Sequence, residues 1–189
     1  MRIKPILILC LLICLSVSSC SSSDNTKSSN DPKSENSKVE KEEKALSGNE
    51  LIESVFVDLK SQVATVKHSR ILDEDSDGNN LIGKQGQYQY AGSFYDTRTG
   101  YEPTNDDFEP IDISEDPYGA SAGGTIEIFS TENDAKKRAD YLSEFQTGLI
   151  QAGAYRVVGN VVLRASEEYK ASEQTEVLDL MESILLSNK

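Results

Sequence analysis

Three aspartates at alternate positions form a pattern that could bind a metal ion. Asp73, Asp75 and Asp77 precede Gly78 as in the first half of a calcium loop, where calcium takes oxygen ligands and glycine allows the turn. The twelfth position of an EF-hand loop carries a bidentate glutamate, but here it is Lys84. A complete EF-hand is therefore excluded. The pattern leaves two interpretations open, a partial calcium site and a solvated acidic turn.

The chain has few histidine and cysteine side chains that could bind a metal or act in catalysis. His68 is the only histidine, and it is expected just after a helix, where a cation suits the helix dipole. Cys10 and Cys14 lie within a predicted signal segment, so only Cys20 remains in the mature chain. Zinc sites built from His and Cys are therefore excluded, and no cofactor is expected other than the calcium ion that the aspartate pattern allows. A pair of carboxylates could still hydrolyse a substrate, although no spacing singles out a pair.

Tyrosines gather around one predicted strand and the long segment that follows it. A tyrosine combines contact area with a polar hydroxyl, so those that are not buried could form a binding surface. Asp96 and Arg98 are expected to form an ion pair at the end of that strand. The candidate binding residues are Tyr88, Tyr90, Tyr95, Tyr101 and Tyr118.

The N-terminal residues indicate how the chain is held. Arg2 and Lys4 precede an apolar stretch over 5–15, and small residues at 16–19 precede Cys20. This is the layout of a secretory signal, and its end resembles the bacterial lipoprotein signal. The resemblance implies that Cys20 becomes the first mature residue and carries diacylglycerol and palmitate, and two or more acyl chains anchor a protein stably. An ordinary cleaved signal, with Cys20 incidental, is the alternative.

Composition divides the chain into three parts. A signal peptide over 1–19 is followed by the lipidated cysteine and a polar tether over 20–47, which is expected to be disordered. Residues 48–189 are long enough for one domain with its own core. The chain has 19 basic and 32 acidic residues and a net charge of −13, which argues against nucleic acid and anionic lipid surfaces as partners.

Three segments have apolar residues at helical spacing, and each is expected to pack one face against the domain. They cover 51–66, 135–149 and 177–185. In the second segment, the basic residues 136–138 are expected on the solvent side.

Strand patterns lie between these segments. They cover 88–95, 125–129, 155–158 and 161–163, and Gly159-Asn160 predicts a type II′ hairpin turn between the last two. The order α-β-β-α-β-β-α predicts an α+β domain of two layers. A mostly antiparallel four-stranded sheet would carry three helices on one face. The segment 97–122 would be a long excursion between two strands.

The order of several motifs is similar to a family of secreted proteins and lipoproteins of Gram-positive bacteria with no established activity. The similarity covers most of 71–187 and implies one coherent domain in a Gram-positive envelope, without catalytic residues to assign. Some members have cysteines near the second strand, which this chain lacks. The motifs are 75–83, 86–88, 94–98, 123–129, 134–135, 138–141 and 159–164.

These observations predict a non-enzymatic binding module anchored at the outer face of the cytoplasmic membrane. The aromatic strand and the acidic segment 97–122 would form its contact surface. Expected partners are the membrane, through the lipid on Cys20, and an envelope protein or wall component. Two alternatives stay open: a small envelope hydrolase using carboxylates, and a phage- or element-borne exclusion lipoprotein.

Overall fold

The computed structural model describes residues 46–105, 107–114, 118–145 and 152–189. All of them belong to the compact unit Glu42–Lys189. Within these ranges, no helix combines the length and the apolar character needed to cross a membrane. Cys20, the predicted signal peptide and most of the predicted tether lie outside the described residues, so these predictions stay predictions.

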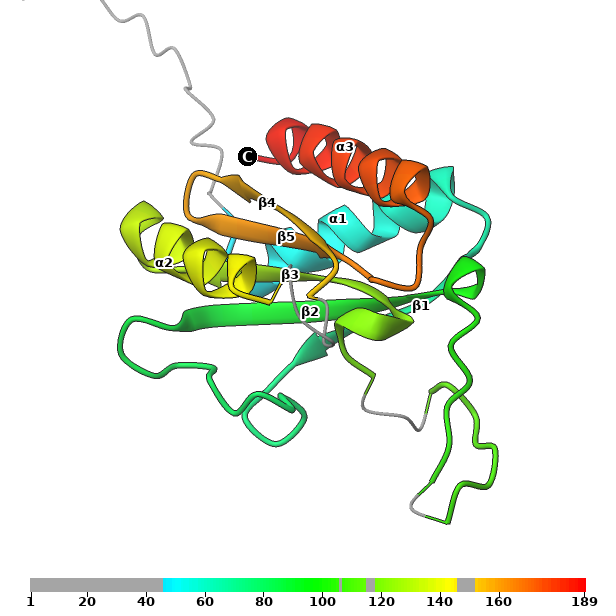
Figure 1. The fold of residues 1–189 in the computed structure, drawn as a ribbon. Helices are drawn as coiled ribbons and strands as arrows, with labels where there is room; N and C mark the ends of the chain where they lie inside the picture. Colours follow the sequence, from blue (N-terminus) through cyan, green and yellow to red (C-terminus); the bar gives the residue numbers. More distant parts are fainter. Residues whose placement is uncertain (1–45, 106, 115–117, 146–151) are drawn as a thin grey trace, which may run out of the picture. The chain divides into compact units, whose positions relative to one another are not determined.

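Three helices and five strands form an α+β domain (Figure 1). The strands pair into one antiparallel sheet in the order β1-β2-β3-β5-β4. The α+β class is confirmed, but the predicted count of four strands and the predicted element order are wrong. Along the chain the elements are α1 (Gly48–Gln62), β1 (Val66–Leu72), β2 (Tyr88–Asp96), the 3-10 turns η1 (Thr97–Thr99) and η2 (Ala120–Ala122), β3 (Gly123–Phe129), α2 (Glu132–Ser143), β4 (Ala154–Val158), β5 (Val161–Ala165) and α3 (Ala171–Ser187).

The sequence pattern does not predict strand β1, because its first residue continues the helical spacing of the segment 51–66. Helix α1 ends at Gln62, and Val66 begins a strand instead of continuing the apolar stripe. The strand pairs with β2 and places His68 opposite Tyr95, so His68 does not cap a helix. Pairing along β2 satisfies the backbone of this segment and outweighs its weak helical pattern.

Helices cover both faces of the sheet, so the expected arrangement of two layers is wrong. Helices α1 and α3 pack on one face, which we call the first face, and α2 packs on the opposite, second face (Figure 1). Every residue of β3 is buried as a result. A strand covered on both faces lacks the alternation of a half-exposed strand.

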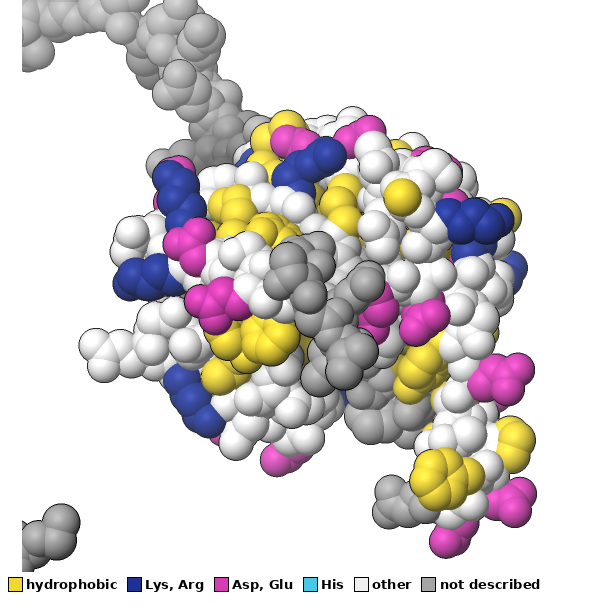
Figure 2. Space-filling view, in the orientation of Figure 1, with side chains coloured by type: hydrophobic (Ala, Val, Ile, Leu, Met, Phe, Trp, Pro, Cys, Tyr) yellow, Lys and Arg dark blue, Asp and Glu magenta, His cyan; other side chains and the backbone are white. Residues whose placement is uncertain are grey.

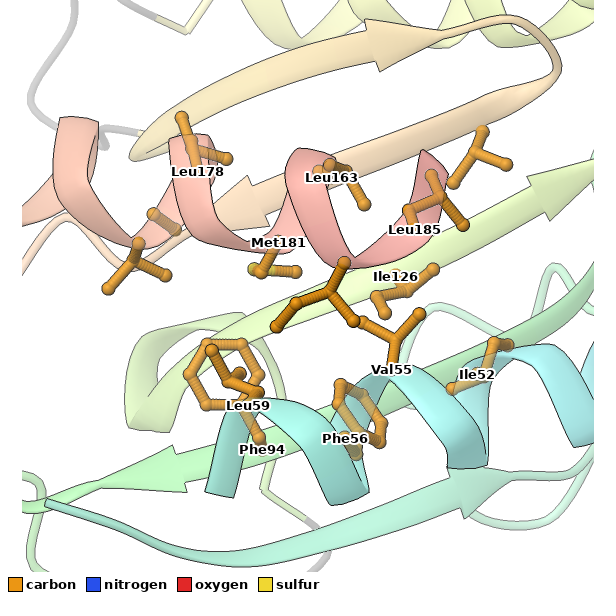
Figure 3. Close-up of a cluster of buried hydrophobic side chains, with 14 of the residues drawn as sticks. Ile52, Val55, Phe56, Leu59, Phe94, Ile126, Leu163, Leu178, Met181 and Leu185 are labelled. Atoms are coloured by element: carbon orange, nitrogen blue, oxygen red, sulfur yellow. The ribbon is translucent and has the colours of Figure 1, made fainter. Parts of the chain in front are cut away.

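The first face carries the main hydrophobic core (Figure 3). Phe56 of α1 meets Phe94 of β2 with ring centroids 5.9 Å apart, and Met181 of α3 lies in the same cluster. Helix α1 begins with a capping box, in which the Ser47 and Glu50 side chains accept each other's backbone N–H groups. The first face is therefore packed with apolar side chains, and the buried charged pairs around Glu127 lie on the second face.

Candidate functional site

The second face combines apolar packing with a buried polar network. Alternation along β3 directs Ile126 to the first face and Glu127 to the second. On β5, Arg164 faces the same way and forms an ion pair with Glu127. Charged side chains are thus placed between the sheet and α2, where water is largely excluded.

A β-bulge brings Tyr88 to this face. The pairing of β2 with β3 shifts register between Tyr88 and Tyr90, so the two side chains no longer share a face. The Tyr88 ring packs edge-on against Phe129, with centroids 5.9 Å apart. Its hydroxyl donates to both carboxylate oxygens of Asp77, at 2.8 and 2.9 Å.

Asp77 organises the loop between β1 and β2. Its carboxylate accepts from the backbone N–H groups of Leu81 at 2.7 Å, Ile82 at 3.1 Å and Asn79 at 3.1 Å. Burial by itself would raise the pKa of Asp77, but these hydrogen bonds and that from Tyr88 outweigh it and hold the pKa below its ordinary value. Burial, together with the Asp77 carboxylate, raises the pKa of the Tyr88 hydroxyl, so the pair stays carboxylate and phenol at neutral pH.

Two arginines share the carboxylate of Glu127. Arg138 of α2 donates from Nε at 2.8 Å and from Nη2 at 2.9 Å, which is a bidentate pair. Arg164 donates from Nη1 at 3.3 Å. The side chains are 3%, 7% and 12% exposed for Glu127, Arg138 and Arg164. The three therefore bury one more positive than negative charge.

Arg164 is the less satisfied of the two arginines. Its two hydrogen bonds, to Glu127 and to the carbonyl of Ala152, are both 3.3 Å long, whereas charged pairs prefer about 2.7–2.9 Å. Its Nε and the hydroxyl of Thr125 are buried without a hydrogen-bond partner among the described residues. Thr125 and Arg164 are register partners on β3 and β5, so these groups belong to one region of the second face.

Two cavities flank this network. The larger one, which we call the α2 cavity, has a volume of about 640 Å³ and lies beside α2. The smaller has about 280 Å³ and lies between the Asp77 loop and η2. Asn79 and Arg164 line both. The α2 cavity is lined by Asn79, Leu81, Gly86, Gln87, Asp134, Lys137, Arg138, Tyr141, Leu142, Phe145, Ala152 and Arg164.

The charges that line the α2 cavity are mainly positive. Among the described lining residues, they are Lys137, Arg138 and Arg164 against one acid, Asp134. Asp134 accepts hydrogen bonds from Thr131 at the start of α2 and from Lys137, and both lower its pKa. Figure 2 shows basic and acidic side chains interspersed with hydrophobic ones around α2. A positive, partly apolar wall is unusual in a chain whose net charge is −13.

The predicted calcium ligands do not converge. Asp73 closes a turn by accepting from the backbone N–H and hydroxyl of Ser76, and with Asp75 it lines a surface cavity next to His68. Asp77 lies on the other side, against the sheet. Across the described ranges, no group of three or more His, Cys, Asp or Glu side chains is arranged to hold a metal. Calcium binding stays a prediction.

The five predicted binding tyrosines do not form one surface. Tyr88 and Tyr118 are buried, and Tyr88 serves the network described above. Tyr90 is exposed beside the start of α1, while Tyr95 lies next to His68 and Tyr101 is half-buried beyond η1. Of the five, Tyr88 and Tyr118 line the smaller cavity, and none is among the described residues that line the α2 cavity.

The expected ion pair between Asp96 and Arg98 is confirmed. Arg98 donates from Nη2 at 2.7 Å and from Nε at 3.0 Å to the buried Asp96 carboxylate. Burial opposes ionisation, but these bonds hold the pKa of Asp96 below its usual value. The guanidinium also lies 5.1 Å from the ring centroid of Tyr169, so the pair fastens η1 to the segment before α3.

The segment between η1 and η2 extends away from the sheet (Figure 1). An isolated bridge between Thr104 and Pro110 closes a short hairpin within it. Phe108 near its tip is 86% exposed and has a φ of 62°, which is rare for a bulky residue.

Arg138 is a site residue that the sequence interpretation placed in solvent. Lys136 and Lys137 are exposed as expected, whereas Arg138 is buried. The signal was its spacing: Arg138 lies three residues after Ala135 and four before Leu142, both buried in the apolar stripe. A basic residue within such a stripe requires a buried acid, and Glu127 within an apolar strand supplies it.

Comparison with models of protein families, with curated proteins and with solved structures found no match for this chain.

Proposed function

We propose that the chain is a lipid-anchored protein of the outer face of the cytoplasmic membrane, whose domain binds a small molecule without turning it over. The observation that carries the binding function is the α2 cavity. Its volume of about 640 Å³ falls within the range of ligand sites, about 300–1,000 Å³. Its wall combines apolar side chains with a few converging polar groups, as such sites do.

Binding is favoured over hydrolysis because the nearby carboxylates are already engaged. A hydrolase that uses two carboxylates needs one that is held protonated, with a raised pKa. The pKa values of Asp77 and Asp134 are lowered instead. Both oxygens of Glu127 accept from arginine, so this carboxylate is already engaged in structural ion pairs.

The anchor is proposed from the N-terminal sequence, in which small residues lead to Cys20 after an apolar stretch. A diacylglycerol thioether would hold the chain stably at the membrane. The polar stretch after Cys20 would then act as a spacer between lipid and domain.

Blocking the α2 cavity tests the binding function. Gln87 lines the cavity and Gln85 is an exposed glutamine that does not. The full chain in nanodiscs of zwitterionic lipid is titrated with small aromatic molecules of negative, neutral and positive charge, and binding is measured by ligand-observed NMR against empty nanodiscs. We expect Gln87→Trp to weaken binding by at least about tenfold, since the indole occupies ligand space, and Gln85→Trp to leave it unchanged. Equal binding by both variants, or no binding of any probe, contradicts the function.

Replacing the lipidated cysteine tests the anchor separately. In cells fed a labelled fatty acid, the wild-type chain is expected to carry the label, and Cys20→Ala is expected to lose it because the thioether cannot form. Cys14→Ala is the control, since it removes a cysteine from the predicted signal and should keep the label. Label retained on the Cys20→Ala chain would refute lipidation at this residue.

A further inference from the structure

We infer that the ligand of the α2 cavity is an organic anion, a carboxylate or phosphate group attached to an apolar body, with Arg164 as its anchor. This inference rests on the proposed binding function and specifies the class of ligand.

The first step concerns charge. Arg138 and Arg164 both line the α2 cavity, whereas Glu127, whose carboxylate they share, lines the smaller cavity together with Arg164. A buried excess of positive charge is costly unless an anion compensates it. Asp77 belongs to the same network, but its oxygens already accept three backbone N–H groups and the Tyr88 hydroxyl. An anion in the α2 cavity, which both arginines line, would supply the compensation.

The second step concerns hydrogen bonds. Arg138 is held firmly by two short bonds to Glu127. Among the described residues, Arg164 has the two long bonds, and its buried Nε finds no partner. A planar guanidinium favours forked pairing with carboxylate or phosphate, so a ligand anion would satisfy Arg164 better than its present partners do. Lys137 at the cavity wall adds a further, exposed positive charge.

The third step concerns the rest of the ligand. Part of the wall is apolar and aromatic, with Leu142 buried and the rings of Tyr141 and Phe145 packed edge to face at 5.0 Å. Tyr141 also lies under the Arg138 guanidinium, 5.6 Å from its ring centroid. A bare inorganic anion would leave this surface wet, whereas an anion with an apolar body would cover it.

A series of probes that differ in charge tests the inference. The full chain in zwitterionic nanodiscs is titrated with 3-phenylpropionate, phenyl phosphate, the neutral 3-phenylpropionamide and the 3-phenylpropylammonium cation. We expect at least one of the two anions to bind about tenfold or more tightly than the amide, and the cation to bind more weakly still. The tighter anion identifies the headgroup class. Stronger binding of the amide or the cation in the cavity overturns the inference and leaves the binding function standing.

Adjacent lysines on α2 provide a matched pair of variants. Both are exposed and both pair with an acid of the same helix, Lys136 with Glu132 and Lys137 with Asp134. Only Lys137 lines the cavity. Lys137→Gln is expected to weaken anion binding about two- to fivefold and Lys136→Gln to leave it unchanged. Equal effects of the two variants would mean that the anion does not bind there.

Arg164→Gln is expected to weaken anion binding by more than about tenfold while changing binding of the amide little. Its thermal unfolding is measured alongside, because Arg164 is largely buried. If Arg164→Gln unfolds, the lysine pair still decides the question. If it folds and binds the anion normally, Arg164 is not the anchor.

Discussion

Replacing Glu127 by leucine is expected to lower the free energy of unfolding by about 3–5 kcal/mol. The variant leaves Arg138 and Arg164 buried on the second face without the carboxylate that both contact. Removing one partner of a buried ion pair costs this much because the remaining charge is neither solvated nor paired. Urea unfolding of the full chain in nanodiscs, followed by tyrosine fluorescence, measures the change.

Glu132→Leu is the control for this prediction. Glu132 forms an ion pair of similar length with Lys136, 2.6 Å, but both side chains are exposed. Exposed pairs contribute about 0–1 kcal/mol, so this variant should change the unfolding free energy little. If the two leucine variants unfold at similar urea concentrations, the network around Glu127 does not stabilise the fold.

Replacing Asp77 by alanine is expected to lower the free energy of unfolding by about 3 kcal/mol. The change leaves the N–H groups of Leu81 and Ile82 and the buried hydroxyl of Tyr88 without their acceptor. Asp75→Ala, two residues earlier and exposed, should stay within about 0.5 kcal/mol of the wild type. Equal stability of the two variants would show that Asp77 does not organise the loop.

The contribution of Asp77 to the free energy of unfolding is expected to depend on pH. Its pKa is lower in the folded protein than in the unfolded chain, so it stabilises the fold fully above the unfolded value of about 4. That contribution is lost as the pH falls through the folded pKa. The difference in stability between wild type and Asp77→Ala should therefore shrink below about pH 4, and a difference that grows on acidification would contradict this assignment.

The sequence was sufficient for elements that lie in one regular pattern. Four strand patterns, the last helix and the Gly159 turn correspond to elements of the structure, and the positive φ of Gly159 is that of a II′ turn. It was not sufficient where tertiary pairing decides. Val63 and Val66 continue the apolar spacing of α1, yet Val66 pairs with β2 and begins strand β1. The bulge between Tyr88 and Tyr90 turns the Tyr88 side chain to the second face, and no proline or glycine at the bulge indicates it.

The site was predicted only in fragments for the same reason. Asp77 stood out as an acid of a calcium-like pattern, but its contacts with Tyr88 depend on the bulge. Arg138 looked like one of three basic residues on a wet helix face because the helices were all placed on the other side of the sheet. Once α2 covers the second face, the same residue meets Glu127. Charge complementarity between distant segments is not visible in local spacing.

The edge strands have a consequence for how neighbouring copies of the chain meet. β1 is one edge of the sheet, and an edge presents backbone groups that a second molecule can pair with. A protein tethered to a membrane, as proposed, is confined with its copies to a thin layer where such encounters are frequent. β1 carries Lys67 and Arg70 and no acid, so two copies joined edge to edge in antiparallel fashion would bring like charges close to one another. This strand thereby opposes the fusion of sheets into aggregates at the surface.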